Sequence, residues 1–210
     1  AGGYEGGPID TFPYILGRDF SGVVSAVGEG ADLAVGDEVF GVLDVGQEGA
    51  YAEKVGVKSS ILARKPVGLS HVDAAAIGLT GLTAKISIED TIKLQPGETI
   101  LVQGGAGGVA SMAIQIAKHI GANVITTASP SNHEYLRSLG ADEIIDYNTV
   151  DFTTIVSGID AVFETAGEDV TMRSFKVLRP GGRAAFIASG PKAPVSSRAD
   201  VTSLRPAVGR

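Results

Sequence analysis

Hydrophobic and polar positions alternate along the first third of the chain with a period near two. Residues 1–65 contain short runs of this kind separated by glycine turns, which predicts strands at residues 21–28, 37–43 and 50–57. Short strands joined by glycine turns are typical of all-β proteins, so we expect a small barrel in this part of the chain.

The pattern changes after Lys65-Pro66. An Ala-rich run at residues 69–88 predicts a helix, and Ser70-x-x-Asp73 resembles a capping box at its start. Strand and helix patterns then alternate, and the expected elements are strands at 99–103, 123–127, 143–146, 160–164 and 183–188 with helices at 109–120, 132–139 and 171–178. Such alternation predicts an α/β fold with a doubly wound parallel sheet and crossover helices.

These patterns divide the chain into three parts, residues 1–70, 71–200 and 201–210. The first is the β-rich domain and the second the α/β domain. The stretch "PKAPVSSRADVTSLRPAVGR" shows no strong periodicity, so we expect a loop or a disordered tail. The chain begins on "AGGYEGG" and stops on "AVGR" without a capping element, and we therefore expect a fragment truncated at both ends.

Composition narrows the functional classes. The chain has 210 residues, a net charge of −7 and no basic cluster, which is a poor match for nucleic acid or an anionic membrane. Cysteine is absent, so disulfides and thiolate metal sites are excluded. No apolar run reaches ~18 residues and no segment resembles a signal peptide, so a cytoplasmic location is expected. The 29 glycines indicate many tight turns or close approaches of backbone to a ligand.

One glycine cluster carries candidate chemistry. In "TILVQGGAGGVASMAIQIAKHI" the spacing Gly105-x-Gly107-x-x-Ala110 follows a strand pattern and precedes a helix pattern, as in dinucleotide-binding sites. Gly105 would permit the tight turn, Gly107 the approach of a pyrophosphate, and Ala110 close helix–strand packing. The phosphates would bind free N–H groups at the helix start, which includes Gly108 and Val109. The alternative is a purely structural glycine turn.

The same helix shows an apolar face with helical spacing, formed by Val109, Met112, Ala113, Ile116, Ala117 and Ile120. No Lys-[Ser/Thr] pair follows the glycines, so the loop is not that of a nucleoside-triphosphate site.

The end of the next strand predicts which dinucleotide binds. An NAD site usually has Asp or Glu about 20 residues after the glycines, to accept a hydrogen bond from the ribose 2′-hydroxyl. This chain has Thr127, Ala128 and Ser129 there, which leaves room and hydroxyl donors for a 2′-phosphate. The sequence therefore favours NADPH over NADH. The alternative is that Ser129 is an ordinary helix N-cap before Pro130.

Several stretches together resemble a known family. "GGAGGVAS", "GANVITTAS", "LGADEIIDY" and "VLRPGGRAAFIASG" are similar to the medium-chain dehydrogenase/reductase superfamily, in particular its zinc-free quinone oxidoreductases related to zeta-crystallin. "YILGRDFSGVVSAVGEGADLAVGDEVFG" resembles that superfamily's GroES-like domain. The resemblance implies an incomplete GroES-like substrate domain at 1–70, a Rossmann domain at 71–200, and an active site in the cleft between them. It also implies that the last Rossmann strand is missing and that the full-length protein is a homodimer or homotetramer.

The zinc-dependent members of the superfamily carry Gly-His-Glu where this chain has Gly17-Arg18-Asp19, and arginine cannot bind zinc. The three histidines, His71, His119 and His133, show no ligand spacing. We therefore expect no zinc, and we expect Arg18 and Asp19 to form either a structural ion pair or part of a substrate site.

The resemblance also implies roles for single residues. Tyr4 matches a tyrosine that lines the nicotinamide pocket, where it would orient substrate, and Thr83 matches a threonine near the nicotinamide. Tyr147 matches a tyrosine near the adenosine phosphate. The alternatives are a residue on a frayed terminus for Tyr4, a helix residue bonded to backbone for Thr83, and packing at a strand end for Tyr147.

Other matching positions lie at strand ends. Gly167, Ser189 and Gly190 follow later strands, where ligands bind in such sheets. The family often has a 2′-phosphate-binding lysine near the position of Asn132, so Asn132 departs from the pattern, and Arg137 is a possible substitute.

Without a metal or an evident acid–base pair, the expected reaction is one that the cofactor performs largely by itself. Hydride transfer from NADPH to a quinone or an α,β-unsaturated carbonyl fits this requirement. Two alternatives stay open: a non-catalytic NADPH-binding redox sensor or scaffold, and an enoyl reductase of a larger synthase.

Overall fold

The computed structural model describes residues 12–47 and 49–208, which form two compact units that divide between Leu82 and Thr83. The helix α1 (His71–Lys85) crosses this division. The functional division at residue 70 stays a prediction. Among the described residues, no helix has both the length and the apolar character required to cross a membrane.

The first unit contains an antiparallel sheet with the order β1-β2-β3. Its strands are β1 (Asp19–Val23), β2 (Glu38–Val42) and β3 (Leu62–Arg64), and the 3₁₀ turn η1 (Ser59–Ile61) leads into β3. This sheet is the part of the incomplete GroES-like barrel that the described residues contain. The strand predicted at residues 37–43 is confirmed as β2, whereas the strand predicted at 21–28 is confirmed only in part, because β1 begins at Asp19 and ends at Val23.

The strand predicted at residues 50–57 is wrong. The N–H groups of Ala50 and Tyr51 donate to the carbonyls of Gly17 and Leu16, at 3.0 and 2.9 Å, so this segment is held by a loop contact and not by a ladder. The third strand, β3, is instead Leu62–Arg64, in which Arg64 pairs with Val39.

The predicted capping box is confirmed at the start of α1. The Ser70 hydroxyl accepts the N–H of Asp73 at 3.1 Å and donates to the Asp73 carboxylate at 2.5 Å. The helix does not end near residue 88 as expected but continues as a π-helix, η2 (Ile86–Ile92), which ends at Lys93 with a left-handed backbone, φ 56° and ψ 50°.

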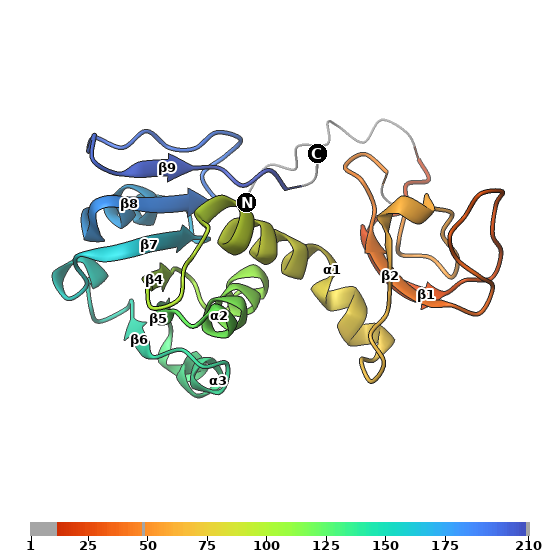
Figure 1. Ribbon diagram of the computed structural model, residues 1–210, viewed down its shortest axis with the longest axis horizontal. Helices are drawn as coiled ribbons and strands as arrows, with labels where there is room; N and C mark the ends of the chain where they lie inside the picture. The colour runs from red at the N-terminus through yellow and green to blue at the C-terminus, as the bar shows by residue number, and fades with distance from the viewer. Residues whose placement is uncertain (1–11, 48, 209–210) are drawn as a thin grey trace. The chain divides into compact units, whose positions relative to one another are not determined.

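The second unit is built on a six-stranded parallel sheet with the order β6-β5-β4-β7-β8-β9 (Figure 1). Its strands are β4 (Thr99–Val102), β5 (Asn123–Ala128), β6 (Glu143–Asp146), β7 (Ile159–Glu164), β8 (Leu178–Phe186) and β9 (Thr202–Leu204). The predicted Rossmann-type fold is confirmed.

The expectations for the end of the chain are wrong in one respect. Residues 202–204, expected in a structureless tail, form the edge strand β9, in which Ser203 pairs with Ala184. The sheet therefore has a sixth strand where the resemblance implied a missing one.

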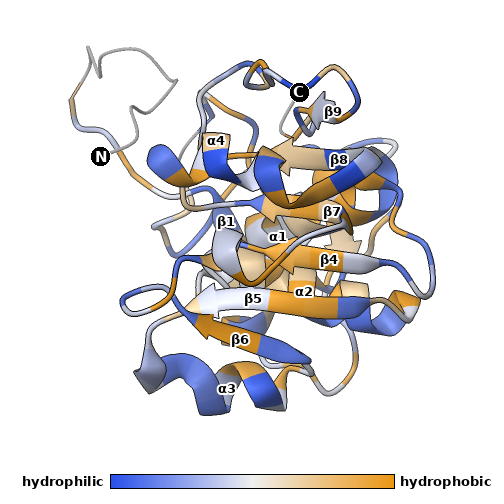
Figure 2. Ribbon diagram, turned by 90° about the vertical axis from the view of Figure 1, so that its left-hand side faces the viewer, coloured by the Kyte–Doolittle hydropathy of each residue, from blue (hydrophilic) through white to orange (hydrophobic). Residues whose placement is uncertain are grey.

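Helices cover both faces of this sheet. They are α2 (Gly108–Ile120), α3 (His133–Ser138) and α4 (Asp169–Ser174), with the 3₁₀ turns η3 (Pro130–Asn132), η4 (Phe152–Thr154) and η5 (Phe175–Val177). Successive residues of β4 face opposite sides, so Ile100 and Val102 join the core under α2 while Leu101 joins the core that contains Phe175 of η5. Figure 2 shows predominantly hydrophobic strands beside a largely hydrophilic α3.

The buried face of α2 is shifted by one position from the predicted one. Ala110, Ala113, Ile114 and Ala117 are completely or almost completely buried, whereas the larger residues of the predicted face are only partly buried and pack around this stripe. Small side chains let the helix approach β4 and β5 closely, which places its N-terminus at the end of these strands.

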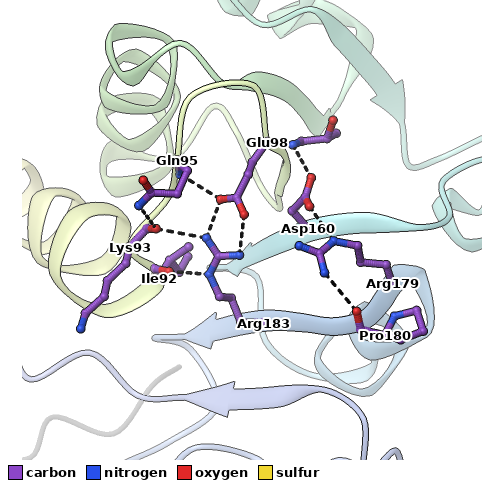
Figure 3. A network of polar contacts seen from close by, with 9 residues as sticks. Ile92, Lys93, Gln95, Glu98, Asp160, Arg179, Pro180 and Arg183 are labelled. Carbon is purple, nitrogen blue, oxygen red and sulfur yellow. Dashed lines mark hydrogen bonds and ion pairs between the residues drawn. The ribbon is translucent and has the colours of Figure 1, made fainter.

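A polar network holds the opposite, amino edge of the sheet (Figure 3). Arg183 of β8 donates to both carboxylate oxygens of Glu98, at 3.0 and 2.5 Å, and to the carbonyl of Ile92 at 2.5 Å. The hydrogen bonds from Arg183 lower the pKa of the Glu98 carboxyl. Arg183 thereby joins the end of the π-helix to the start of β4 and to β8.

Candidate functional site

The glycine loop, Gln103–Gly108, connects β4 to α2. Gly104 has a left-handed backbone, φ +70°, so the tight turn lies there and not at Gly105 as predicted. Gly105 is required for a different reason: a Cβ at this position would collide with the Thr126 hydroxyl of β5 and would lie 3.2 Å from Ile114 of α2. The loop is therefore pressed against the neighbouring strand and the helix.

The start of α2 presents free N–H groups. Gly107 is the N-cap residue and no side chain caps the helix. The N–H of Ser111 makes the first helical bond, to the Gly107 carbonyl at 2.9 Å, so the N–H groups of Gly108, Val109 and Ala110 precede the helical ladder. Gly107 and Gly108 are exposed and Ala110 is buried against the strands. Such a helix end suits a phosphate group, and these residues fit the diphosphate of a dinucleotide.

The end of β5 carries a cluster of small polar groups. Ser129 occupies the N-cap position of η3, but its hydroxyl accepts the side-chain amide of Asn132 at 3.1 Å and lies 3.3 Å from the Ser131 hydroxyl. His133 lies beside them, with Nε2 3.3 Å from the Ala128 carbonyl oxygen. The side chain of Ser129 therefore does not cap the helix through a backbone N–H.

Four of the remaining predicted residues lie at the same edge, after the strands β6, β7 and β8. Tyr147 follows β6 and is 58% exposed, so it does not pack into the strand end. Gly167 follows β7 with φ +80°, and a Cβ there would lie 3.4 Å from Ala188. Gly190 has φ +91°, and the buried Ser189 hydroxyl has no hydrogen-bond partner among the described residues.

Two buried polar residues at this edge were not predicted. Gln103 is 2% exposed; its side-chain carbonyl accepts the Thr127 hydroxyl at 2.8 Å, and its Nε2 has no partner in the described part of the chain. Glu164, the last residue of β7, is completely buried. The only signal in the sequence was a polar residue directly after an apolar strand pattern.

No hydrogen bond or ion pair observed among the described residues links Thr83 to this edge of the sheet. Thr83 lies within α1, 7% exposed, and its backbone carbonyl accepts the Ser87 hydroxyl at 2.7 Å. Tyr4 lies outside the described residues. The roles assigned to both residues stay predictions.

The expected ion pair between Arg18 and Asp19 does not form. The Arg18 Nε donates to the Leu43 carbonyl at 2.8 Å, and the Asp19 carboxylate accepts the N–H of Leu79, in the middle of α1, at 2.6 Å. Gly78 permits this approach, because a Cβ there would lie 2.8 Å from the Asp19 carboxylate. Both side chains therefore have structural partners within the first unit.

The histidines do not gather into a metal site. His71 lies between the Ser21 hydroxyl, 2.8 Å from Nδ1, and the Glu38 carboxylate, 3.3 Å from Nε2. In residues 12–47 and 49–208, no three His, Cys, Asp or Glu side chains lie close enough together to hold a metal ion.

Comparison with known families matches both units. Residues 1–67 match the alcohol dehydrogenase GroES-like domain, and residues 108–207 match the zinc-binding dehydrogenase family. A solved NAD-dependent alcohol dehydrogenase is 31% identical, with a TM-score of 0.82, and this chain covers 70% of it. The chain belongs to the medium-chain dehydrogenase/reductase superfamily. Its relatives place it in the quinone oxidoreductase branch of that superfamily.

Two curated relatives represent different contexts for this fold. The 2-methylene-furan-3-one reductase of Solanum lycopersicum is 38% identical over 205 residues, which are 93% of this chain and 51% of that protein. A pikromycin polyketide synthase component of Streptomyces venezuelae is 35% identical over 206 residues, which are 94% of this chain and 5% of that protein. The chain thus spans about half the length of the reductase, and a small part of the synthase.

Solved structures of quinone oxidoreductases have a similar fold. A quinone oxidoreductase of Pseudomonas syringae is 32% identical with a TM-score of 0.85, over 96% of this chain and 66% of that one. The Escherichia coli quinone oxidoreductase, solved in complex with NADPH, is 28% identical with a TM-score of 0.79, over 91% of this chain and 60% of that one.

Proposed function

We propose that this chain is part of an NADPH-dependent oxidoreductase that transfers hydride to a quinone or an α,β-unsaturated carbonyl without zinc. The observation that carries the proposal is the carboxyl edge of the parallel sheet. There, an uncapped helix start with free N–H groups stands beside a strand end that carries hydroxyls and an amide in place of an acid.

The division of labour in binding follows from these groups. The N–H groups of Gly108 and Val109 would hold the diphosphate, while Ser129 and Asn132 would donate hydrogen bonds to the 2′-phosphate. Because no carboxylate follows β5 directly, a 2′-phosphate meets no like charge there. The NADPH complex of the related Escherichia coli enzyme supports this choice of cofactor.

The protein's main task in this reaction is to orient the substrate. NADPH supplies the hydride, and quinones and enones are already electrophilic. The protein has to align substrate with the nicotinamide and exclude water, a role we assign to Tyr4 and Thr83. Zinc is not required for this reaction, and the arginine at the position of the family's zinc-binding histidine, Arg18, is bonded to a backbone carbonyl.

A second candidate is an enoyl reductase within a larger synthase, which the similarity to a polyketide synthase component favours. An enoyl thioester is also an α,β-unsaturated carbonyl, so the same site would serve it. Carrier or synthase domains encoded beside this chain would favour the enoyl reductase, and their absence from the full-length protein would favour the free-standing reductase.

The test is a titration of the full-length protein with NADPH and with NADH, followed by nicotinamide fluorescence. We expect tighter binding of NADPH. A Ser129→Asp variant should lose at least about tenfold in NADPH affinity relative to NADH, because a carboxylate repels the 2′-phosphate. Ser138→Asp, at the far end of α3, adds the same charge and should leave the ratio unchanged.

Turnover separates the remaining alternatives. Oxidation of NADPH by a simple quinone or enone supports the reductase. Tight NADPH binding without turnover of any quinone, enone or enoyl thioester would instead identify a non-catalytic redox sensor or scaffold. Equal affinity for both nucleotides would refute the role of Ser129. The predicted dimer or tetramer is measured on the same sample by light scattering.

A further inference from the structure

Glu164 is a completely buried carboxylate at the carboxyl edge of the sheet. One of its oxygens accepts the N–H groups of Ala166 and Gly167, both at 2.5 Å, and the other accepts the Thr171 hydroxyl of α4 at 3.1 Å. No Lys, Arg or His of the described residues forms an ion pair with it. Burying a carboxylate without a cation costs free energy unless its oxygens accept hydrogen bonds. These three bonds therefore offset the cost of burying Glu164.

The segment that Glu164 holds is the rim loop, Thr165–Glu168, between β7 and α4. Its backbone takes two consecutive positive φ angles, +80° at Gly167 and 55° at Glu168. Glu168 is one of two non-glycine residues with positive φ among the described residues, the other being Lys93. A side-chain-bearing residue keeps such a backbone only where surrounding contacts impose it, and the Glu164 carboxylate supplies those contacts on the preceding two residues.

The rim loop is also tied to the glycine loop. The Thr165 hydroxyl donates to the Gln103 carbonyl at 2.7 Å, and a Cβ at Gly104 would lie 3.2 Å from the same hydroxyl. Val102 pairs with Phe163, so Gln103 and Glu164 each follow a paired residue on adjacent strands. The position of the rim loop therefore determines how much room is left for a ligand beside the glycine loop.

We propose that Glu164 is a positioning residue for the dinucleotide site. It acts through the N–H groups of Ala166 and Gly167, which fix the rim loop against the glycine loop, and it does not itself touch the cofactor. This inference rests on the proposed function, because it assumes that the glycine loop binds a dinucleotide.

The test compares two carboxylates of one strand in the full-length protein. Asp160 lies at the amino end of β7, where it accepts the N–H of Thr99 at 2.8 Å, and it serves as the matched control. We expect Glu164→Ala to raise the Kd for NADPH at least about tenfold, and Asp160→Asn to lower the Tm without changing that Kd. Glu164→Gln keeps an oxygen that accepts both rim-loop N–H groups, so it should restore the Kd to within about threefold of wild type.

Three results would overturn the inference. The first is a folded Glu164→Ala variant with the wild-type Kd, and the second is an Asp160→Asn variant that weakens NADPH as much as Glu164→Ala does. If Glu164→Ala does not fold, Thr165→Val replaces it, since it removes only the bond between the two loops. The third is then an unchanged Kd in Thr165→Val. A wild-type protein that binds neither NADPH nor NADH refutes the proposed function itself, and this inference with it.

Discussion

Gly105 offers a prediction whose size follows directly from the structure. A Cβ at this position would collide with the Thr126 hydroxyl and lie 3.2 Å from both Thr126 Cβ and Ile114 Cδ1. Thr126 is completely buried and its hydroxyl donates to the Val102 carbonyl at 2.7 Å, so it cannot move without losing that bond. Overpacking of this kind costs about 1–3 kcal/mol, and we expect Gly105→Ala to lose that much of its unfolding free energy.

The measurement is thermal and urea unfolding of wild type and variant. For a chain of this size, 1 kcal/mol shifts the Tm by about 2–4 °C, so the expected fall is about 2–12 °C. Gly28→Ala is the control, because its Cβ would meet nothing within 4 Å and its backbone φ is not positive. It should leave the Tm unchanged or raise it slightly.

A double-mutant cycle identifies the cause. Thr126→Ala removes the hydroxyl that collides, at a cost of about 1–2 kcal/mol for the lost hydrogen bond and methyl group. If the collision is the cause, the double variant should cost at least about 1 kcal/mol less than the sum of the single changes. Strict additivity, or a Gly105→Ala protein as stable as wild type, would refute the reasoning.

Three further outcomes are expected. Arg183→Lys should cost about 1–3 kcal/mol in urea unfolding, because lysine cannot reproduce the paired bonds to Glu98 together with the bond to Ile92. The pKa of the Glu98 carboxyl is lowered in the folded protein from its ordinary value of 4.5, so the ionised carboxyl adds to the free energy of unfolding above pH 4.5, and this contribution is lost as the pH falls further. Urea midpoints measured between pH 3 and 7 should therefore fall at the acid end of the range. Arg183→Leu should make this fall smaller. Ser70→Ala removes the hydroxyl that accepts the N–H of Asp73 and donates to its carboxylate, and should lower stability by about 1 kcal/mol, measured as a Tm decrease, whereas Ser70→Thr should retain most of it.

The parallel sheet could be predicted because its strand and helix patterns are long and alternate regularly. The short strands β3 and β9 could not, since three residues carry too little periodicity and their pairing depends on partners far along the chain, Val39 for Arg64 and Ala184 for Ser203. The irregular segment at residues 50–51 shows the converse, because an alternating pattern there is overridden by contacts with Gly17.

The glycine loop could be located from the spacing of its glycines alone, but the structural role of each glycine could not be assigned. The turn lies at Gly104, and Gly105 is needed for contact with Thr126, a residue that only the fold brings near. Glu164 was missed for a related reason. A charged residue is ordinarily exposed, and only the assembled sheet shows that this one is completely buried beside two backbone N–H groups.

The cap that Arg183 places on the π-helix has a consequence for how the protein is made. Arg183 lies 91 residues after Ile92, whose carbonyl it binds. Ribosomes add roughly 5–20 residues per second, so this arginine is synthesised roughly 5–18 s after the helix it completes. During that interval the carbonyl of Ile92 lacks its Arg183 partner, whereas the carbonyl of Lys93 can still accept the side-chain amide of Gln95, at 2.8 Å in the folded protein. A nascent chain that stalls before residue 183 thus lacks the contact that completes this helix end.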